Sequence, residues 1–365
     1  MKVAIITPST NAYSETFIQA HIRLLRGEKV VYSGGSLPSL VNDSPIAVNL
    51  SFGTKMYRKI CRTIGLIRFS DAQIAFQQSL VQEKPDVVLA EYGVTGAEIL
   101  DIVKSLHLPL VVHFHGYDAS EITTLQKYQT KYLEMFAYAK KIVGVSILMC
   151  NKLIELGCPP EKIVYTCYGP NDAYLQIKPN SQSFQFLAVG RFVEKKAPHL
   201  TILAFYKVLA NYPNAKLRMA GDGPLKVICE DLVNALRING SVLFLGKQTA
   251  QEIIQEMSTA FCFIQHSRTA TSGDMEGSPV GIIEAQAAAL PVVSTKHAGI
   301  QDVVVHQKTG LLVNEGDVEE MAKCLLHFLD NPIEAKKMGE DGRKRILETF
   351  TMDKHIETLN ALLDS

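Results

Sequence analysis

Residues 274–293 have the sequence DMEGSPVGIIEAQAAALPVV, in which a loop with glycine and proline precedes an alanine-rich run and a short apolar segment. Pro279 suits the first turn of a helix, because a residue without an N–H leaves no donor unpaired there. The apolar residues 291–294 are typical of a buried strand. The stretch is therefore predicted to be one helix–strand unit of an α/β domain.

The same alternation continues on both sides of this unit. Short β-branched runs are separated by amphipathic segments, which predicts parallel strands buried on both faces. The polar stretch 177–185 is typical of a linker. Two doubly wound domains are therefore predicted, followed by a last helix at 352–363. The expected strands are at 3–7, 30–32, 86–90, 110–114 and 141–145, and then at 186–189, 216–219, 242–245, 260–264, 291–294 and 310–313.

Composition excludes several classes of protein. The 365 residues include 37 Lys and Arg and 37 Asp and Glu, and a zero net charge argues against a general nucleic-acid binder. Seven scattered cysteines without a C-x-x-C spacing make a disulfide framework or a cysteine zinc site unexpected, and they fit a reducing cytoplasm. No run approaches the roughly 20 apolar residues of a spanning helix, and the first residues lack the long apolar region of a signal peptide.

The loop before the helix of residues 274–293 is the most informative candidate site. Ligands of open α/β sheets bind beyond the carboxyl ends of the strands. The amides of Ser278, Val280 and Gly281 would face outward at a helix N-terminus and could hold a phosphate. Glu284 would accept hydrogen bonds from vicinal hydroxyls such as those of a ribose, and Glu276 would contact a sugar. The alternative is a solvated loop, which the glycines and small residues around it disfavour.

A second junction carries two cations. Arg191 and Lys196 follow an expected strand and precede a helix start near Pro198. Two cations there would stabilise a departing diphosphate by charge and by forked hydrogen bonding. The alternative is a pair of surface cations, the usual fate of these residue types. From this segment alone, the two interpretations stay open.

A third junction, HFHGYD (113–118), carries two histidines and an acid. His115 could touch a substrate hydroxyl or donate to a developing charge, or it could be structural. His113 shares its strand face but lies deeper in the sheet, so a structural role is expected for it.

Two other segments allow alternatives. In the polar loop 7–19, Ser14 or Thr16 could cap the following helix, or the loop could contact an acceptor or a diphosphate. Segment 55–69 has cations at helical spacing, so it could contact an anionic membrane surface or pack on its own domain. The cations are Lys55, Arg58, Lys59 and Arg62.

Together these segments resemble glycosyltransferase family 4, whose members are retaining enzymes that use nucleotide sugars. The resemblance extends over nearly the whole chain, and its most specific part is the E-x7-E unit from Glu276 to Glu284. Supporting segments are HGYD (115–118), GRFVEKK (190–196), AGDGPL (220–225) and LPVVSTKHAGIQDVV (290–304).

The resemblance implies the GT-B fold, in which two Rossmann-like domains face each other across a cleft. Residues 1–174 with 350–365 would bind the acceptor, and residues 175–349 would bind the nucleotide sugar. The residues that it implies are Lys247 and Gln248 for the base, Glu284 for the ribose, Ser278, Pro279, Val280, Gly281, Arg191 and Lys196 for the diphosphate, and Glu276 and His115 for the donor sugar.

The expected activity is transfer of a hexose-type unit from a UDP- or GDP-sugar to a hydroxyl of a glycan or lipid-linked acceptor. Retention of configuration and a role in cell-surface polysaccharide biosynthesis are expected, in the cytoplasm or at the inner face of the membrane. No cofactor and no metal are expected. A metal-dependent transferase of the other common fold would show a D-x-D motif early in the chain, and residues 274–276, which approximate that motif, come late. The alternatives are a nucleotide-sugar 2-epimerase or phosphorylase of the same fold, and a noncatalytic two-lobed sugar-binding protein.

Overall fold

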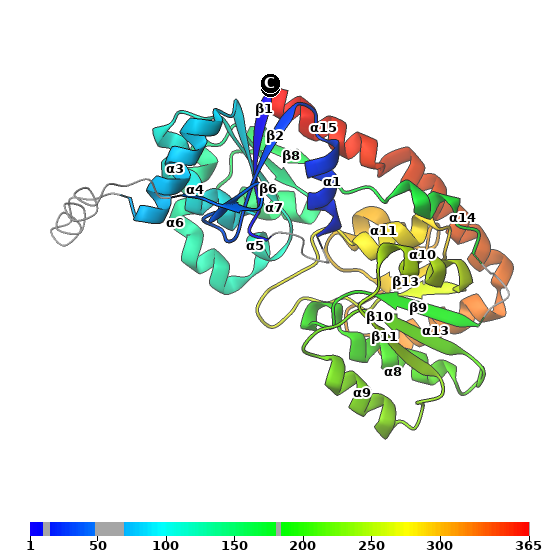
Figure 1. Ribbon diagram of the computed structural model, residues 1–365. Coiled ribbons are helices and arrows are strands. Elements are labelled where there is room, and N and C mark those ends of the chain that lie inside the picture. The colour runs from blue at the N-terminus through cyan, green and yellow to red at the C-terminus, as the bar shows by residue number, and fades with distance from the viewer. Residues whose placement is uncertain (10–14, 48–68, 180–183, 365) are drawn as a thin grey trace.

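The computed structural model describes residues 1–9, 15–47, 69–179 and 184–364. Two separate sheets organise these residues into two lobes (Figure 1). We call the lobe around the first sheet the first lobe, and the lobe around the second sheet the second lobe.

The sheet of the first lobe has eight strands in the order β4-β3-β2-β1-β5-β6-β7-β8. The pairs β2–β3 and β3–β4 are antiparallel, and the other pairs are parallel. The five expected strands are confirmed, whereas β3, β4 and β8 were missed because they are two or three residues long and lack a buried apolar run. The bounds are β1 Lys2–Ile6, β2 Glu28–Ser33, β3 Leu40–Val41, β4 Ser44–Pro45, β5 Val87–Glu91, β6 Leu110–Phe114, β7 Lys141–Gly144 and β8 Ile163–Tyr165.

The sheet of the second lobe has six strands, all parallel, in the order β11-β10-β9-β12-β13-β14. All six were expected from their short apolar runs. Their bounds are β9 Gln185–Val189, β10 Lys216–Ala220, β11 Val242–Gly246, β12 Cys262–Ile264, β13 Val292–Thr295 and β14 Leu311–Val313.

Helices follow the strands, and local signals explain several of their ends. Ser70 and Thr249 each close a capping box with the residue three positions later. Pro198 and Pro332 each occupy the first residue of a helix, where the missing N–H costs nothing. The first lobe has α1 Thr16–Leu24, α3 Asp71–Glu83, α4 Gly93–Ser105, α5 Tyr117–Ser120, α6 Ile122–Tyr138 and α7 Ile147–Glu155.

The second lobe has α8 Pro198–Val208, α9 Lys226–Ala235, α10 Ala250–Thr259, α11 Val280–Ala287, α12 Ile300–Val303, α13 Val318–Asp330 and α14 Pro332–Thr349. Three 3-10 helices lie between longer elements, namely η1 Pro160–Lys162, η2 Asp172–Gln176 and η3 Glu194–Lys196. None of the helices among the described residues is both long enough and apolar enough to cross a bilayer. Residues 55–68 of the basic segment lie outside the described residues, so its contact with a membrane stays a prediction.

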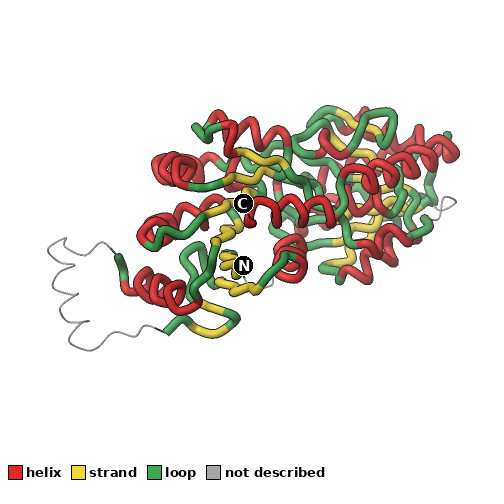
Figure 2. The backbone as a smooth tube through the Cα atoms, turned by 90° about the horizontal axis from the view of Figure 1, so that it is seen from above, coloured by secondary structure: helices red, strands yellow, loops and turns green. Residues whose placement is uncertain are grey.

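The last helix, α15 Met352–Asp364, confirms the expected helix and returns to the first lobe. Ile356, Leu359 and Leu363 are buried in one cluster with apolar residues of β1, β5, β6 and β7. Both chain ends therefore lie in the same lobe (Figure 2). The expected domain limits stay a prediction, but Cys167 and Tyr174, which precede the expected boundary, pack in a core cluster of the second lobe.

Replacing Leu359 by Ala tests how firmly α15 is held. Leu359 is fully buried, so the lost contacts and the cavity should lower the free energy of unfolding by about 2–5 kcal/mol. Leu347→Ala on α14 is the matched control, because that side chain is about half exposed (49%) and the same change should cost within about 0.5 kcal/mol. Urea denaturation followed by circular dichroism measures both, and equal losses would contradict the burial of Leu359.

Candidate functional site

A pocket opens in the second lobe at the carboxyl ends of β9 and β12. The strand order reverses between these two strands, which is where open α/β sheets bind ligands. The lining comes from the ends of three strands and from the start of α8, and includes Gly190, Arg191, Lys196, Ala220 and Gln265. The structure therefore brings the two predicted cations, Arg191 and Lys196, to one pocket.

Lys196 and Glu276, predicted from separate segments, form an ion pair. The Lys196 Nζ lies 3.0 Å from the Glu276 Oε1, and the Glu276 side chain is only 6% exposed. Burial alone would raise the pKa of Glu276, but Lys196 and Lys195 hold it below its ordinary value. The backbone N–H of Glu276 donates to His297 Nε2 at 3.1 Å, so the loop is also anchored by the turn that follows β13. Glu276 is thus a fixed, ionised carboxylate paired with a lysine that lines the pocket.

Lys195 is a second buried cation at this place, and it was not predicted. Its Nζ donates to Asp274 Oδ1 at 2.9 Å and to the Met275 carbonyl at 3.1 Å. Between η3 and α8, the backbone of Ala197 has a positive φ of 36°, a conformation that residues other than glycine rarely adopt. The sequence EKK offered a signal, since two adjacent lysines before a helix start double the charge available to an anion.

The loop after Glu276 touches the first lobe directly. A Cβ built on Gly277 would lie 2.0 Å from the His115 carbonyl oxygen, so only glycine allows this approach. Met275 N–H donates to Ser120 Oγ at 3.2 Å, and Ile147 N–H donates to Asp302 Oδ2 at 2.8 Å. The two lobes are therefore joined on both sides of the loop.

A second pocket lies at this junction and has walls from both lobes. Gly116, Ser146 and Lys152 line it from the first lobe, and Glu276 and Ala298 line it from the second. The carboxylate that pairs with Lys196 thus lies between the two pockets.

The helix N-terminus at the loop differs in detail from the expectation. Helix α11 begins at Val280, and Pro279 is its N-cap rather than its first residue. The Val280 N–H already bonds the Ser278 carbonyl at 3.0 Å, so the expectation of a free amide is wrong there. The amides of Ser278 and Gly281 make no hydrogen bond within the described part of the chain, and these two remain able to bind a phosphate.

Glu284 lies in the second turn of α11, and its carboxyl has a raised pKa. Burial raises its pKa to about 7, and a hydrogen bond from Tyr174 opposes the rise. The carboxyl is therefore close to half ionised at neutral pH, and hydroxyl donors would favour its ionised form.

The remaining predicted residues of the second lobe lie around the same sheet edge. Arg191 is exposed, and its guanidinium pairs with no residue that the structure describes. Lys247 and Gln248 follow β11, and Gln248 Nε2 donates to the Leu245 carbonyl at 2.8 Å. The Gly246 carbonyl accepts from the Gly221 N–H at 2.7 Å, which joins this loop to the AGDGPL turn.

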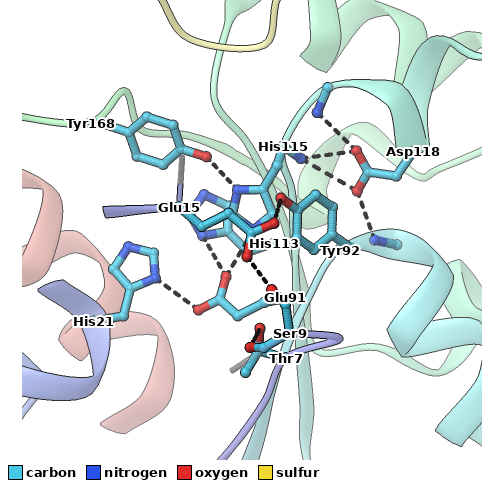
Figure 3. Close-up of polar contacts among 12 residues, drawn as sticks. Thr7, Ser9, Glu15, His21, Glu91, Tyr92, His113, His115, Asp118 and Tyr168 are labelled. Atoms are coloured by element: carbon cyan, nitrogen blue, oxygen red, sulfur yellow. Dashed lines mark hydrogen bonds and ion pairs between the residues drawn. The ribbon is translucent and has the colours of Figure 1, made fainter. Parts of the chain in front are cut away.

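His115 lies at the end of β6 with both ring nitrogens occupied by protein groups (Figure 3). Nε2 lies 2.8 Å from Glu91 Oε2, and Nδ1 contacts the Tyr168 hydroxyl. Asp118 accepts the backbone N–H groups of His115 and Gly116, so it fixes the loop rather than facing the pocket. Touching a sugar with the imidazole would need one of these bonds to break.

The structure describes part of loop 7–19, namely residues 7–9 and 15–19. Glu15, not Ser14 or Thr16, is the N-cap of α1, and its side chain makes no capping bond. Glu15 accepts instead from Ser9 Oγ and from the Tyr92 hydroxyl, as Figure 3 shows. Ser14 lies outside the described residues. A role of this loop toward an acceptor or a diphosphate stays a prediction.

Among the described residues, two groups of buried side chains, mostly histidines, have a spacing that would suit a metal ion. They are His21, His113 and His355, and Glu91, His113 and His115, each group with ligand atoms within 4.8 Å of one another. Most of these nitrogens already have hydrogen-bond partners, so the spacing alone does not require an ion.

Comparison with known proteins identifies the family of the chain. The family described as glycosyl transferases group 1 matches residues 175–345, and the one described as glycosyltransferase family 4 matches residues 48–169. The chain belongs to glycosyltransferase family 4. Each of the two matches lies mainly within one lobe of the family 4 chain.

Curated relatives and solved structures extend this finding. The putative colanic acid biosynthesis glycosyltransferase WcaL of Salmonella typhimurium is 31% identical over 67% of this chain, and the amylovoran biosynthesis glycosyltransferase AmsK of Erwinia amylovora is 32% identical over 67%. The matched part spans 61% of the length of each relative. Anabaena HepE, solved in complex with UDP, superposes with a TM-score of 0.79 at 16% identity over the full length of both chains.

The fold is GT-B, as the resemblance implied. Sucrose-phosphate synthase from Thermosynechococcus elongatus shares it, with a TM-score of 0.73 at 17% identity over 99% of this chain and 98% of that one. In this family 4 chain, sequence reasoning missed Lys195, Glu91 and His297. Glu91 carried a signal, since an acid at the carboxyl end of a buried strand needs a partner.

Gly277→Ala tests the junction of the lobes. All three atoms that a Cβ would meet, the nearest at 2.0 Å, belong to the first lobe. The variant should therefore separate the lobes while each stays folded, and small-angle scattering should show a larger radius of gyration with unchanged circular dichroism. Gly240→Ala is the control, because a Cβ there has nothing within 4 Å. An unchanged radius in Gly277→Ala would contradict the contact.

Proposed function

We propose that the chain is a retaining glycosyltransferase that moves a sugar from a UDP- or GDP-sugar to a hydroxyl of a glycan or lipid-linked acceptor. The observation that carries the proposal is the Lys196–Glu276 ion pair at the switch-point pocket, beside the start of α11. The names of WcaL and AmsK, which refer to the biosynthesis of colanic acid and amylovoran, support a role in polysaccharide biosynthesis. That the polysaccharide is a cell-surface one and that the enzyme works at the cytoplasmic side of the membrane are further parts of the proposal.

Donor binding would use the charges of the second lobe. The diphosphate competes with Glu276 for Lys196 and also meets Arg191 and the free amides of Ser278 and Gly281. Once its lysine is taken, Glu276 accepts hydrogen bonds from hydroxyls of the donor sugar. The ribose diol donates to Glu284, and the base lies toward residues 246–248.

Transfer would depend on stabilising the leaving diphosphate. As the glycosidic bond breaks, negative charge grows on the phosphate oxygens beside Lys196 and Arg191, and such fixed charges act strongly in a site that excludes water. In the first lobe, Glu91 and Asp118 are each occupied by hydrogen-bond donors. Neither of them is free as a nucleophile. Family 4 enzymes are generally retaining, and we therefore infer a front-face route in which a phosphate oxygen takes the acceptor proton. The acceptor enters through the pocket between the lobes, on the face from which the diphosphate leaves. The protein's own cations supply the charge, so the proposal includes no metal and no cofactor.

Lys196→Ala should abolish most of the transfer. Losing one charge that stabilises the leaving group should lower kcat by about 100- to 1,000-fold. Lys207→Ala at the other end of α8 is the matched control, because its ion pair with Glu319 is partly exposed and lies away from the pocket. The first measurement is a thermal-shift screen with UDP, GDP and free sugars, followed by release of UDP or GDP from labelled donors with and without acceptor.

The same assay separates the alternatives. Conversion of the donor without acceptor would identify an epimerase, and stabilisation by free sugar alone would identify a binding protein. Full activity of Lys196→Ala would contradict the site.

The pKa of Glu284 predicts how donor affinity depends on pH. With a pKa of about 7, about a tenth of the carboxyl is ionised at pH 6 and about nine-tenths at pH 8. Because the ionised form accepts both ribose hydroxyls, UDP should bind several-fold more tightly at pH 8. Calorimetry at the two pH values measures this change.

Glu284→Gln is the control for that measurement. It keeps the shape of the side chain but cannot ionise, and the phosphate of UDP, with a pKa near 6, titrates equally in both proteins. The variant should therefore lose the part of the pH dependence that belongs to Glu284. An identical pH dependence in both proteins would show that Glu284 does not bind the ribose.

A further inference from the structure

Four histidines and one glutamate meet beneath the junction of the lobes, and we call them the histidine network. They come from distant parts of the chain: α1, β5, β6 with the residue that follows it, and the C-terminal helix α15 (Figure 3 labels the side chains from all of these except α15). All five side chains are nearly or completely buried. The members are His21, Glu91, His113, His115 and His355.

Short contacts connect the network from the loop at β6 to α15. Glu91 lies 2.8 Å from His115 Nε2 through one oxygen and 2.7 Å from His21 Nδ1 through the other. His21 Nε2 lies 2.8 Å from His355 Nε2, and His355 Nδ1 lies 2.9 Å from Thr166 Oγ1. His113 fills space beside them, 3.6 Å from Glu91.

The charge of Glu91 determines where the protons lie. Burial would raise the pKa of this carboxyl, but the histidines around it hold it well below its ordinary value. An ionised carboxylate only accepts, so His21 Nδ1 and His115 Nε2 both carry protons. Burial lowers the pKa of His115 and raises that of Tyr168, so the imidazole is neutral and the phenol keeps its proton. The Tyr168 hydroxyl therefore donates a hydrogen bond to His115 Nδ1. His115 is thereby held in one tautomer.

The backbone beside Glu91 is strained. Tyr92 follows with φ 76° and ψ 137°, a conformation that residues other than glycine adopt only when their surroundings impose it. The Tyr92 hydroxyl donates to Glu15 at 2.8 Å, which holds the turn from the side of α1. Such strain persists only where the surrounding structure holds it, and here it lies next to the buried carboxylate of Glu91.

The orientation of His115 matters because its own carbonyl forms the contact with Gly277. A ring held at both nitrogens holds that peptide in place, and the peptide sets the position of the loop that carries Glu276. We propose that Glu91 is a positioning residue of the transfer reaction, which acts by holding His115, and that His355 makes the C-terminal helix part of the same device through His21. This inference rests on the proposed function.

Glu91→Gln tests the first half of the proposal. In the wild type, the N–H groups of His21 and His115 donate to the two oxygens of Glu91. The glutamine side chain has only one oxygen, and its NH2 group is a donor, so the histidine that faces the NH2 group must change tautomer or lose its bond. We expect kcat to fall at least tenfold while the KM for the donor stays within twofold. Glu91→Asp keeps both acceptor oxygens and should recover part of kcat.

Nitrogen-15 NMR of histidine-labelled protein gives a readout independent of activity. It should show the Nε2–H tautomer of His115 in the wild type and a changed His115 signal in Glu91→Gln, from a changed tautomer or from the loss of its bond to residue 91, with the signal assigned by its absence in His115→Asn. Unchanged kcat or an unchanged His115 signal in Glu91→Gln would overturn the proposal. So would a stoichiometric metal ion in the purified protein that makes the ring nitrogens ligands.

His355→Leu tests the second half against Asn360→Ala. Both residues tether α15 to the first lobe, but Asn360 accepts the Arg26 N–H at 2.9 Å and contacts no member of the network within the described residues. Measured on the folded fraction, His355→Leu should lower kcat several-fold and Asn360→Ala should leave it within twofold. Equal effects of the two variants would show that α15 only stabilises the fold, which overturns the role of His355.

The failure of the two proposals can be distinguished. If no donor gives turnover with the wild type, the proposed function is wrong and the positioning role falls with it. If the wild type turns over and Glu91→Gln does so equally well, only the positioning role is wrong.

Discussion

The close approach of the Gly277 backbone to the His115 carbonyl is the constraint on which the site depends. A Cβ would reduce the separation to 2.0 Å, so the chain needs glycine there to bring a loop of the second lobe against the end of β6. This contact fixes the positions of the residues on either side of that glycine. Glu276 reaches the pocket between the lobes, and the start of α11 stays in the second lobe beside β9.

Charge is handled differently in the two lobes. In the second lobe the cations face a pocket: Lys196 meets a single carboxylate, and Arg191 is exposed there. An anionic ligand can compete for such groups. In the first lobe, Glu91 and Asp118 are buried and are surrounded by donors. Those carboxylates hold geometry, whereas Lys196 and Arg191 line a pocket and each could take an anion as a partner.

Much of the architecture was predictable because its signals are local. Buried parallel strands show as continuous apolar runs, which is why β1, β5 and β6 and every strand of the second sheet were expected. The two-residue strands β3, which is half-buried, and β4, which is exposed, were not. The helix starts at Pro198 and Met352 also follow local patterns. The site was predictable only where a motif carried it. Glu276, Lys196 and the α11 start were found, but Lys195 and Glu91 were passed over because each is defined by a distant partner.

The sequence by itself determined the two series of strands, the E-x7-E loop and the zero net charge, because each depends on neighbouring residues or on a sum over the chain. The tertiary structure alone decided which groups meet. It paired Lys196 with Glu276 and left Glu284 in an environment that raises its pKa to about 7. It also brought His355 to His21, 334 positions away in the sequence. Contacts of that kind exist only when both sheets and the returning helix are packed, since burial and the approach of partners are properties of the fold.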